Sequence, residues 1–180
     1  MKITFQSKAT LFIALMSLVG LIALKLANQE AQPIFVLDGN FNYGSWQWYL
    51  STVFYVFGHS NVEHFIGNMA ILLLLGPIIE LKYGYKQLLL MSGITALVTG
   101  IFHVLLWDNG LLGCSGIVFM YIVLVTLLNA KGKEIPFTFI LVVLLYLGQE
   151  IYSSFQKDEI SHFAHLFGGA MGAFWGYYKK

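Results

Sequence analysis

Four side chains in this chain of 180 residues have the types and the spacing needed for acyl-transfer chemistry. Ser115 lies in a Gly-Cys-Ser-Gly sequence at 113–116, and a serine becomes a nucleophile when a neutral histidine takes its proton. His165 can serve as that base. The oxyanion of a tetrahedral intermediate needs preorganised N–H donors. His64 and Asn68 can supply them, since two residues four apart share one face of a helix.

The composition indicates that these polar groups lie in a membrane. Hydrophobic residues make up 58% of the chain and charged residues only 11%, which is outside the usual range of soluble domains. Lipid offers the backbone no hydrogen-bond partner, so about 20 apolar residues must cross it as a helix. We expect an all-α membrane protein, a six-transmembrane-helix bundle that forms one domain over 1–180. The predicted spans are approximately 9–25, 61–80, 86–107, 111–130, 135–153 and 160–178, with a long extracytoplasmic loop at 26–60.

Lysine positions support six spans, because cytoplasmic loops accumulate Lys and Arg. With the N-terminus inside, only Lys25 and Lys157 of the ten lysines face outside, and both termini are cytoplasmic. The first apolar run could instead be a secretory signal, since Lys2 and Lys8 precede it. Lys25 interrupts the end of that run and no clean cleavage site follows, so we interpret it as an uncleaved first span.

The candidate groups are predicted to lie at one depth in the membrane. Their three helices run in the same direction, from outside to inside. Counted back from the cytoplasmic lysines at about 1.5 Å per residue, Asn68, Ser115 and His165 lie about 21 to 24 Å above that boundary. In a hydrocarbon core about 30 Å thick, all three fall in the outer third. The serine, the histidine and the amide-plus-imidazole pair therefore share one layer.

Glycines in the last span can bring two of these helices together. Gly168, Gly172 and Gly176 repeat every four residues, so one helix face lacks side chains and a neighbour can approach closely. If that neighbour is the helix of Ser115, the serine oxygen and the His165 ring come within hydrogen-bond reach. The acids before this span, at 158–159, lie in the preceding loop, so we expect a Ser–His dyad.

The first loop is unusually aromatic. Its aromatic residues are Phe35, Phe41, Tyr43, Trp46, Trp48, Tyr49, Phe54, Tyr55 and Phe57. Aromatic rings favour the headgroup zone, where an apolar body and a polar tip are both satisfied. The loop is interpreted either as an interfacial belt or as a segment that lies partly in the outer leaflet and shields a site.

Four short motifs follow one another along the chain: His59-x4-His64-x3-Asn68, Gly76-x3-Glu80-x3-Gly84, Gly113-Cys114-Ser115-Gly116 and Ala164-His165-x2-Gly168-x3-Gly172. Together they resemble the rhomboid family of intramembrane serine proteases. The resemblance implies a rhomboid-like fold, a Ser115–His165 dyad and an oxyanion site formed by His64 and Asn68. It also implies a serine-type endopeptidase that hydrolyses the transmembrane helices of single-pass proteins near their outer ends, with the first loop partly embedded in the lipid bilayer.

Two departures from the family pattern stand out. Four residues after the serine the family often has a tyrosine that packs on the histidine ring, and this chain has Phe119, which keeps the stacking and loses the hydroxyl. The usual Trp-Arg pair of the first loop appears as Trp46-Gln47. A short six-helix chain is also similar to the rhombosortase branch, which has related chemistry and processes a C-terminal sorting tail. We expect a multi-pass integral protein of the bacterial plasma membrane.

Other enzyme and ligand classes fit less well. The chain has no arginine and a net charge of only +1, so a nucleic-acid partner is not expected. A single cysteine, Cys114, cannot close an intrachain disulfide. A metal site built from His64, His162 and His165 lacks the two-histidine helix motif of zinc proteases, and haem ligation has no further support. We therefore expect neither a metal nor a cofactor.

The remaining alternatives do not involve proteolysis. The first is a proteolytically inactive rhomboid-like protein that binds transmembrane helices, against which the intact Ser115 and His165 argue. A small transporter is a weaker option, because few acids lie within the spans. Outside the proposed site, we interpret His59, His103 and His162 as structural or interfacial groups. Glu63 and Glu80 are interpreted as capping or loop-holding groups.

Overall fold

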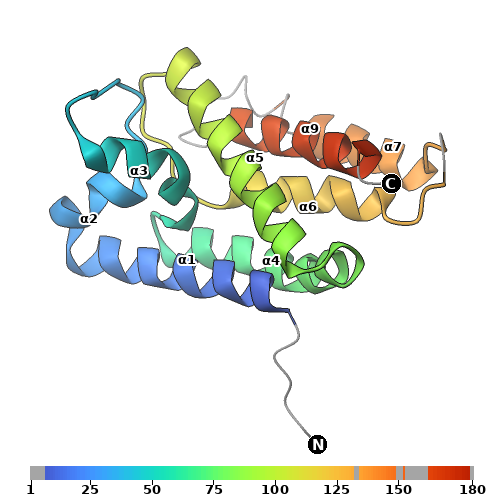
Figure 1. The fold of residues 1–180 in the computed structure, drawn as a ribbon. Coiled ribbons are helices and arrows are strands. Elements are labelled where there is room, and N and C mark those ends of the chain that lie inside the picture. Colours follow the sequence, from blue (N-terminus) through green and yellow to red (C-terminus); the bar gives the residue numbers. More distant parts are fainter. Residues whose placement is uncertain (1–6, 132–133, 149–151, 153–161, 179–180) are drawn as a thin grey trace, which may run out of the picture.

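The computed structural model describes residues 7–131, 134–148, 152 and 162–178. Its helices, shown in Figure 1, are α1 (Lys8–Leu26), α2 (Asn28–Phe35), α3 (Trp46–Phe54), η1 (Tyr55–Phe57), α4 (Val62–Tyr83), α5 (Tyr85–Leu106), α6 (Ser115–Leu127), α7 (Phe137–Val142), the π-helix η2 (Val143–Leu147) and α9 (His162–Tyr178). The described residues contain no β-strand, and Leu37 and Leu111 form one isolated antiparallel bridge. The predicted all-α fold is confirmed.

The helices lie over the ranges predicted as spans. Helices α1, α4 and α5 are long and apolar enough to cross a membrane, whereas α6 and the apolar stretch Phe137–Tyr146 are shorter. Helix α6 begins at Ser115, four residues later than the predicted span 111–130. Outside the described residues lie parts of the last two predicted spans (149–151, 153, 160 and 161) and five of the lysines used above (Lys2, Lys133, Lys157, Lys179 and Lys180).

The first loop contains three helical segments that the sequence analysis did not predict. Helix α2 follows α1 almost directly, and the Ser45 hydroxyl caps α3 by accepting a hydrogen bond from the Trp48 N–H at 3.3 Å. Between α2 and α3, the Leu37 backbone exchanges two hydrogen bonds of 2.9 Å with Leu111, which lies in the segment before α6. These short helices thus form a folded cover that is tied to the candidate site.

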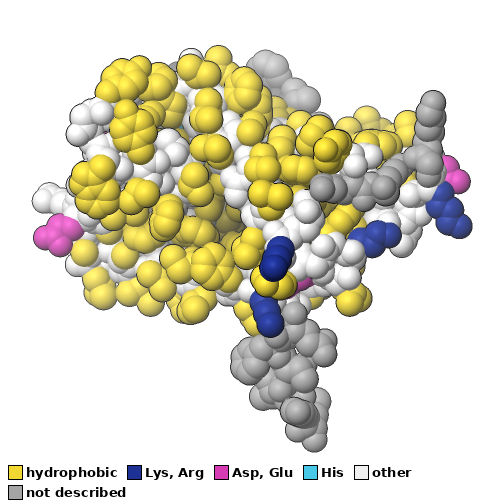
Figure 2. All heavy atoms as spheres, viewed as in Figure 1, with side chains coloured by type: hydrophobic (Ala, Val, Ile, Leu, Met, Phe, Trp, Pro, Cys, Tyr) yellow, Lys and Arg dark blue, Asp and Glu magenta, His cyan; other side chains and the backbone are white. Residues whose placement is uncertain are grey.

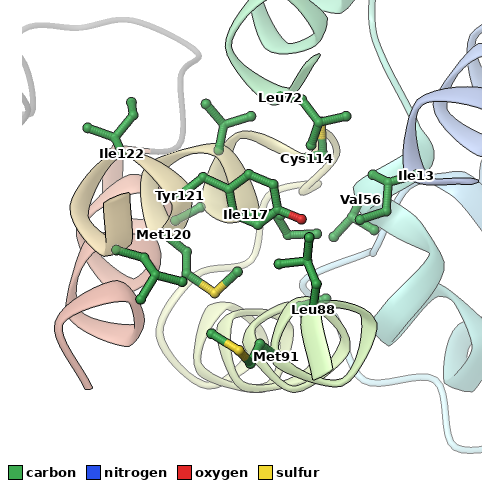
Figure 3. Packing of buried hydrophobic residues seen from close by; sticks show 14 of the residues in the cluster. Ile13, Val56, Leu72, Leu88, Met91, Cys114, Ile117, Met120, Tyr121 and Ile122 are labelled. Atoms are coloured by element: carbon green, nitrogen blue, oxygen red, sulfur yellow. The ribbon is translucent and has the colours of Figure 1, made fainter. Parts of the chain in front are cut away.

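Helix α6 lies at the centre of the bundle. It is apolar around its whole circumference, and such a helix is stable when other helices surround it. It packs against α4, α5, α7 and α9. Figure 3 shows its Ile117, Met120 and Tyr121 beside Leu88 and Met91 of α5, and all five side chains are buried. The helix that carries Ser115 is therefore held from several sides.

Polar side chains fix the rotation of three helices within this core. The Ser92 hydroxyl of α5 lies 3.2 Å from the Tyr121 hydroxyl of α6. The Thr95 hydroxyl donates to the Met120 sulfur at 3.0 Å and accepts from the Trp175 indole N–H at 3.4 Å. Since Trp175 belongs to α9, Thr95 connects α5 with both α6 and α9.

Glu80 joins the first two long helices. This buried carboxylate accepts hydrogen bonds from the Ala9 N–H and the Thr10 N–H, each at 3.0 Å, and from the Thr10 hydroxyl at 2.9 Å. It thereby satisfies donors that the first turn of α1 leaves unpaired and places a negative charge at the positive end of that helix. The prediction of a capping role for Glu80 is confirmed. Gly84, with φ +80°, then makes the turn between α4 and α5.

The outer surface is mostly apolar. Leu15 is 60% exposed on α1, Leu74 is 68% exposed on α4 and Leu105 is 61% exposed on α5. Figure 2 shows a face on which hydrophobic side chains predominate and charged side chains are few. A surface of this kind is stable against lipid acyl chains.

Candidate active site

The predicted glycine face of the last helix meets α6 directly. A Cβ atom at Gly168 would overlap the carbonyl oxygen of Gly116, and one at Gly172 would lie 2.5 Å from the Met120 oxygen. A Cβ at Gly176 would lie 2.9 Å from the Leu127 Cβ. Only glycine permits this approach, and Figure 1 shows α6 and α9 side by side along their lengths. The neighbour of the glycine face is thus the helix that begins at Ser115, as the sequence analysis supposed.

The close approach brings His165 to the face of α6 that carries Ser115. The His165 ring stacks on Phe119, with ring centres 4.3 Å apart and an interplanar angle of 5°. Phe119 is four residues after Ser115, so the two side chains share one face of α6. Ala164, next to His165, has its carbonyl oxygen 3.2 Å from the position of a Cβ on Gly116. Ser115 and His165 are both half-buried, and neighbouring backbone positions of two packed helices carry them.

His64 and Asn68 reach the same place from α4. A Cβ on Gly113 would lie 2.9 Å from His64 Nε2 and 3.9 Å from Asn68 Nδ2. Gly113 has φ +108°, a conformation that side chains with a Cβ rarely adopt. The backbone therefore passes close to both nitrogen-bearing side chains just before it reaches Ser115. The four predicted residues are brought together around the start of α6.

The first loop holds the backbone that leads to Ser115. The Gly113 N–H donates to the Tyr55 carbonyl at 2.9 Å, and the buried Tyr55 hydroxyl donates to the Ala96 carbonyl of α5 at 3.0 Å. Together with the Leu37–Leu111 bridge, these bonds make the loop a support for residues 111–113. The aromatic composition of the loop indicated a belt or a shield and gave no sign of this supporting role.

Helix α6 is too short to cross the hydrocarbon core of a bilayer by itself. Its 13 residues rise about 20 Å, which is less than the roughly 30 Å of hydrocarbon. One end of α6 must therefore lie below the membrane surface. The segment that precedes Ser115, residues 107–114, is not helical. Such backbone is tolerated at membrane depth only where protein or a water-filled cavity surrounds it.

His59 is also part of the site, although it was interpreted above as structural or interfacial. Its ring is fully buried, and its centre lies 5.0 Å from that of His64. His59 Nε2 lies 3.2 Å from Asn68 Nδ2 and 3.7 Å from Cys114 Sγ, and His59 Nδ1 lies 3.3 Å from the Phe57 oxygen. The signal that could have found it is the spacing His59-x4-His64-x3-Asn68 itself.

Burial keeps His59 neutral near pH 7. The pKa of His59 is lowered from 6.5 to about 4. Burial of the ring is the largest cause, and the charge of nearby His64 also lowers the pKa, whereas the hydrogen bond to the Phe57 oxygen raises it. His59 therefore has one N–H donor and one acceptor nitrogen under ordinary conditions.

The other histidines differ in position. His103 is buried on α5, where its Nε2 lies 2.9 Å from the Asn109 oxygen, in agreement with a structural role. His162 is buried on α9 with its ring centre 6.4 Å from that of His165. In the part of the chain that the structure describes, no three His, Cys, Asp or Glu side chains form a group that could hold a metal ion.

A comparison with protein families bears on these residues. The model of the rhomboid domain matches residues 45–180, well over half of the chain. The chain belongs to the rhomboid family. The match includes all four motifs and the α4, α6 and α9 positions that converge at the site. None of the curated proteins matches the chain.

Membership in the rhomboid family defines the broad setting. The protein is an integral membrane protein with a rhomboid-like all-α fold. Rhomboid proteins are typically intramembrane serine proteases that act on other membrane proteins, and the family also has inactive members. The chemistry of this particular rhomboid must be argued from its own residues.

Proposed function

We propose that this rhomboid is an intramembrane serine endopeptidase that uses a Ser115–His165 dyad. The observation that carries the proposal is the contact between α6 and α9, in which His165 stacks on Phe119 on the face of α6 that also carries Ser115. A protein that only binds transmembrane helices has no need for a nucleophile and a base at one point. It also has no need for two further N–H donors beside them.

The first half of the reaction forms an acyl-enzyme. The Ser115 oxygen attacks the carbonyl carbon of a peptide bond while His165 takes the hydroxyl proton. The oxyanion that forms accepts hydrogen bonds from the side chains of Asn68 and His64, whose nitrogens face the backbone at Gly113. His165 then gives the proton to the leaving amine, and the C–N bond breaks.

The second half returns the enzyme to its starting state. A water molecule gives a proton to His165 and attacks the Ser115 ester. Collapse of the second tetrahedral intermediate releases the new carboxyl end, and the proton returns to the serine. Phe119 holds the imidazole plane during both halves. Asp158 and Glu159, which the sequence analysis placed in the loop before the last span, lie outside the described residues, and the proposal uses only the dyad.

The substrates proposed are single-pass transmembrane proteins. With both termini in the cytoplasm, the start of α6 lies toward the outer half of the bilayer, so cleavage occurs near the outer end of the substrate helix. A helical segment hides its carbonyls in hydrogen bonds and must unwind before attack. Good substrates therefore carry Gly, Pro or other weak helix formers at that level. If leucines in this stretch leave the cleavage rate unchanged, the unwinding step is wrong.

The test uses the whole purified protein in detergent with a generic transmembrane substrate and a serine-reactive fluorophosphonate. The variants Ser115→Ala and His165→Ala are compared with Ser51→Ala and His103→Ala. The two controls remove a buried serine of α3 and a buried histidine of α5 that lie outside the site. We expect cleavage and labelling to vanish in the first pair and to persist in the second.

Other outcomes separate the alternatives. Labelling of Ser115 without cleavage of the generic substrate would indicate a specialised substrate, such as the sorting tail of the rhombosortase branch. Neither signal in folded wild-type protein would refute the proposed protease and favour an inactive rhomboid-like protein that binds transmembrane helices.

A further inference from the structure

The side chain of His59 links three separate parts of the site. It comes from the loop before α4, and it contacts the Phe57 carbonyl, the Asn68 amide of α4 and the Cys114 thiol just before Ser115. The ring has no exposed surface, and Asn68 is buried as well. Buried polar groups of this kind are normally hydrogen-bonded, because a buried group without a partner costs free energy.

The hydrogen bonds allow only one tautomer of a neutral His59. A backbone carbonyl can only accept, so the bond between Nδ1 and the Phe57 oxygen requires the hydrogen to be on Nδ1. Nε2 then has a lone pair and no hydrogen. It accepts from the Asn68 amide nitrogen at 3.2 Å and faces the weakly donating Cys114 thiol at 3.7 Å.

The same logic determines the orientation of the Asn68 amide. If the amide were flipped, its carbonyl oxygen would face the lone pair of His59 Nε2, and two acceptors would repel each other. With Nδ2 toward His59, one N–H is used in that bond and the second N–H of the same nitrogen is directed elsewhere. That nitrogen also lies 3.9 Å from the position of a Cβ on Gly113, on the path to Ser115.

From this geometry we infer that His59 is a positioning residue for the oxyanion site: it accepts one N–H of Asn68 so that the other N–H points to the substrate oxyanion. The inference rests on the proposed function. His59 does not touch the reacting atoms in this arrangement. Its effect is electrostatic preorganisation, because a flipped amide would present an oxygen to the negative charge of the intermediate.

Two substitutions distinguish the role of Nδ1 from that of Nε2. In His59→Asn the amide can replace Nδ1 and keep the Phe57 bond, but no acceptor reaches Asn68. In His59→Gln the longer side chain places an amide oxygen near the former Nε2 and can accept from Asn68. We expect His59→Asn to lower kcat about a hundredfold with KM changed less than about twofold, and His59→Gln to retain most of the rate. His103→Asn and His103→Gln, at a buried histidine outside the site, are the matched controls.

A double-mutant cycle distinguishes positioning from a general loss of structure. If His59 acts only through Asn68, the variant Asn68→Ala with His59→Asn has the kcat of Asn68→Ala alone, within about twofold. The inference would be overturned if the losses in kcat of the two single variants multiply in the double variant. It would also be overturned if His59→Asn and His59→Gln lose kcat equally. Thermal unfolding of each variant identifies any that fail to fold.

A second measurement does not depend on cleavage. Nitrogen-15 NMR of histidine-labelled wild-type protein near pH 7 should show His59 protonated at Nδ1 and unprotonated at Nε2, and Asn68→Ala should shift the Nε2 resonance. Protonation at Nε2 would overturn the inference even in an active protease. Absence of wild-type cleavage would instead refute the proposed function, while the NMR result would still decide whether His59 accepts from Asn68.

Discussion

The contact between α6 and α9 allows a quantitative prediction at Gly172. An alanine there would place a Cβ 2.5 Å from the Met120 oxygen and 2.9 Å from the Val123 Cβ of α6. Ordinary van der Waals contact begins at 3.4 Å, so the two helices must separate by about 0.9 Å at this level. Backbone atoms line the site, and a change of side-chain rotamer cannot absorb the shift.

The displacement should reach the catalytic pair. Gly172 is seven residues from His165, about 10 Å along a rigid helix, so α9 carries much of the shift to the histidine. A misplacement of about 1 Å can cost a hundredfold in rate, while overpacking of this size costs about 1–3 kcal/mol of stability. We therefore expect Gly172→Ala to lose between about tenfold and a hundredfold in kcat and to remain folded.

The assay compares kcat for a transmembrane substrate, fluorophosphonate labelling and thermal unfolding in detergent. Gly168→Ala should lose more kcat than Gly172→Ala, because its Cβ would lie 2.7 Å from the carbonyl carbon of Gly116. Gly168 is also one helical turn closer to His165. Gly93→Ala on α5 is the control, since nothing lies within 4 Å of its Cβ position. Wild-type activity in Gly172→Ala, or an equal loss in Gly93→Ala, would refute the argument that helix separation controls the dyad.

Three further results are expected. Phe119→Ala removes the ring that stacks on His165 and should lower the cleavage rate about tenfold, whereas Phe119→Tyr should be tolerated; unchanged activity in the alanine variant would remove Phe119 from the site. Glu80→Ala leaves three donors at the start of α1 without their acceptor and should lower the free energy of unfolding by about 3 kcal/mol, and a wild-type denaturation midpoint would contradict this role. The pKa of His59 is about 4 in the folded protein and 6.5 in the unfolded chain, so the unfolded chain takes up the proton first as the pH falls. The contribution of neutral His59 to the free energy of unfolding is complete above pH 6.5 and decreases by about 3 kcal/mol as the pH falls to 4. The variant His59→Gln should flatten this pH dependence in unfolding curves.

The fold class could be predicted from composition because lipid restricts the backbone so strongly. An apolar run near 20 residues has to be helical, and the helices α1 (Lys8–Leu26) and α5 (Tyr85–Leu106) lie within a residue of the ranges 9–25 and 86–107. The short helices of the first loop could not be predicted in the same way. They have no long apolar run, and their stability depends on contacts such as Leu37 with Leu111.

Part of the candidate site could be predicted by counting residues along each helix. A rise of about 1.5 Å per residue predicts depth, and depth alone suggested that Ser115, His165 and Asn68 lie in one layer. Depth does not determine the rotation of a helix about its axis. That rotation follows from long-range contacts, including the hydrogen bonds of Thr95 to α6 and α9.

The amino-acid sequence by itself thus determined that this rhomboid is helical and membrane-embedded, and which residue types were available for catalysis. Only the tertiary structure decided which side chains meet. His59 shows the difference most clearly: its tautomer, and with it the direction of the Asn68 amide, depends on a carbonyl and an amide that packing brings to opposite sides of one ring. Hydrophobicity acts on each segment separately, whereas the partner of a buried polar group is chosen by the packing of the whole bundle.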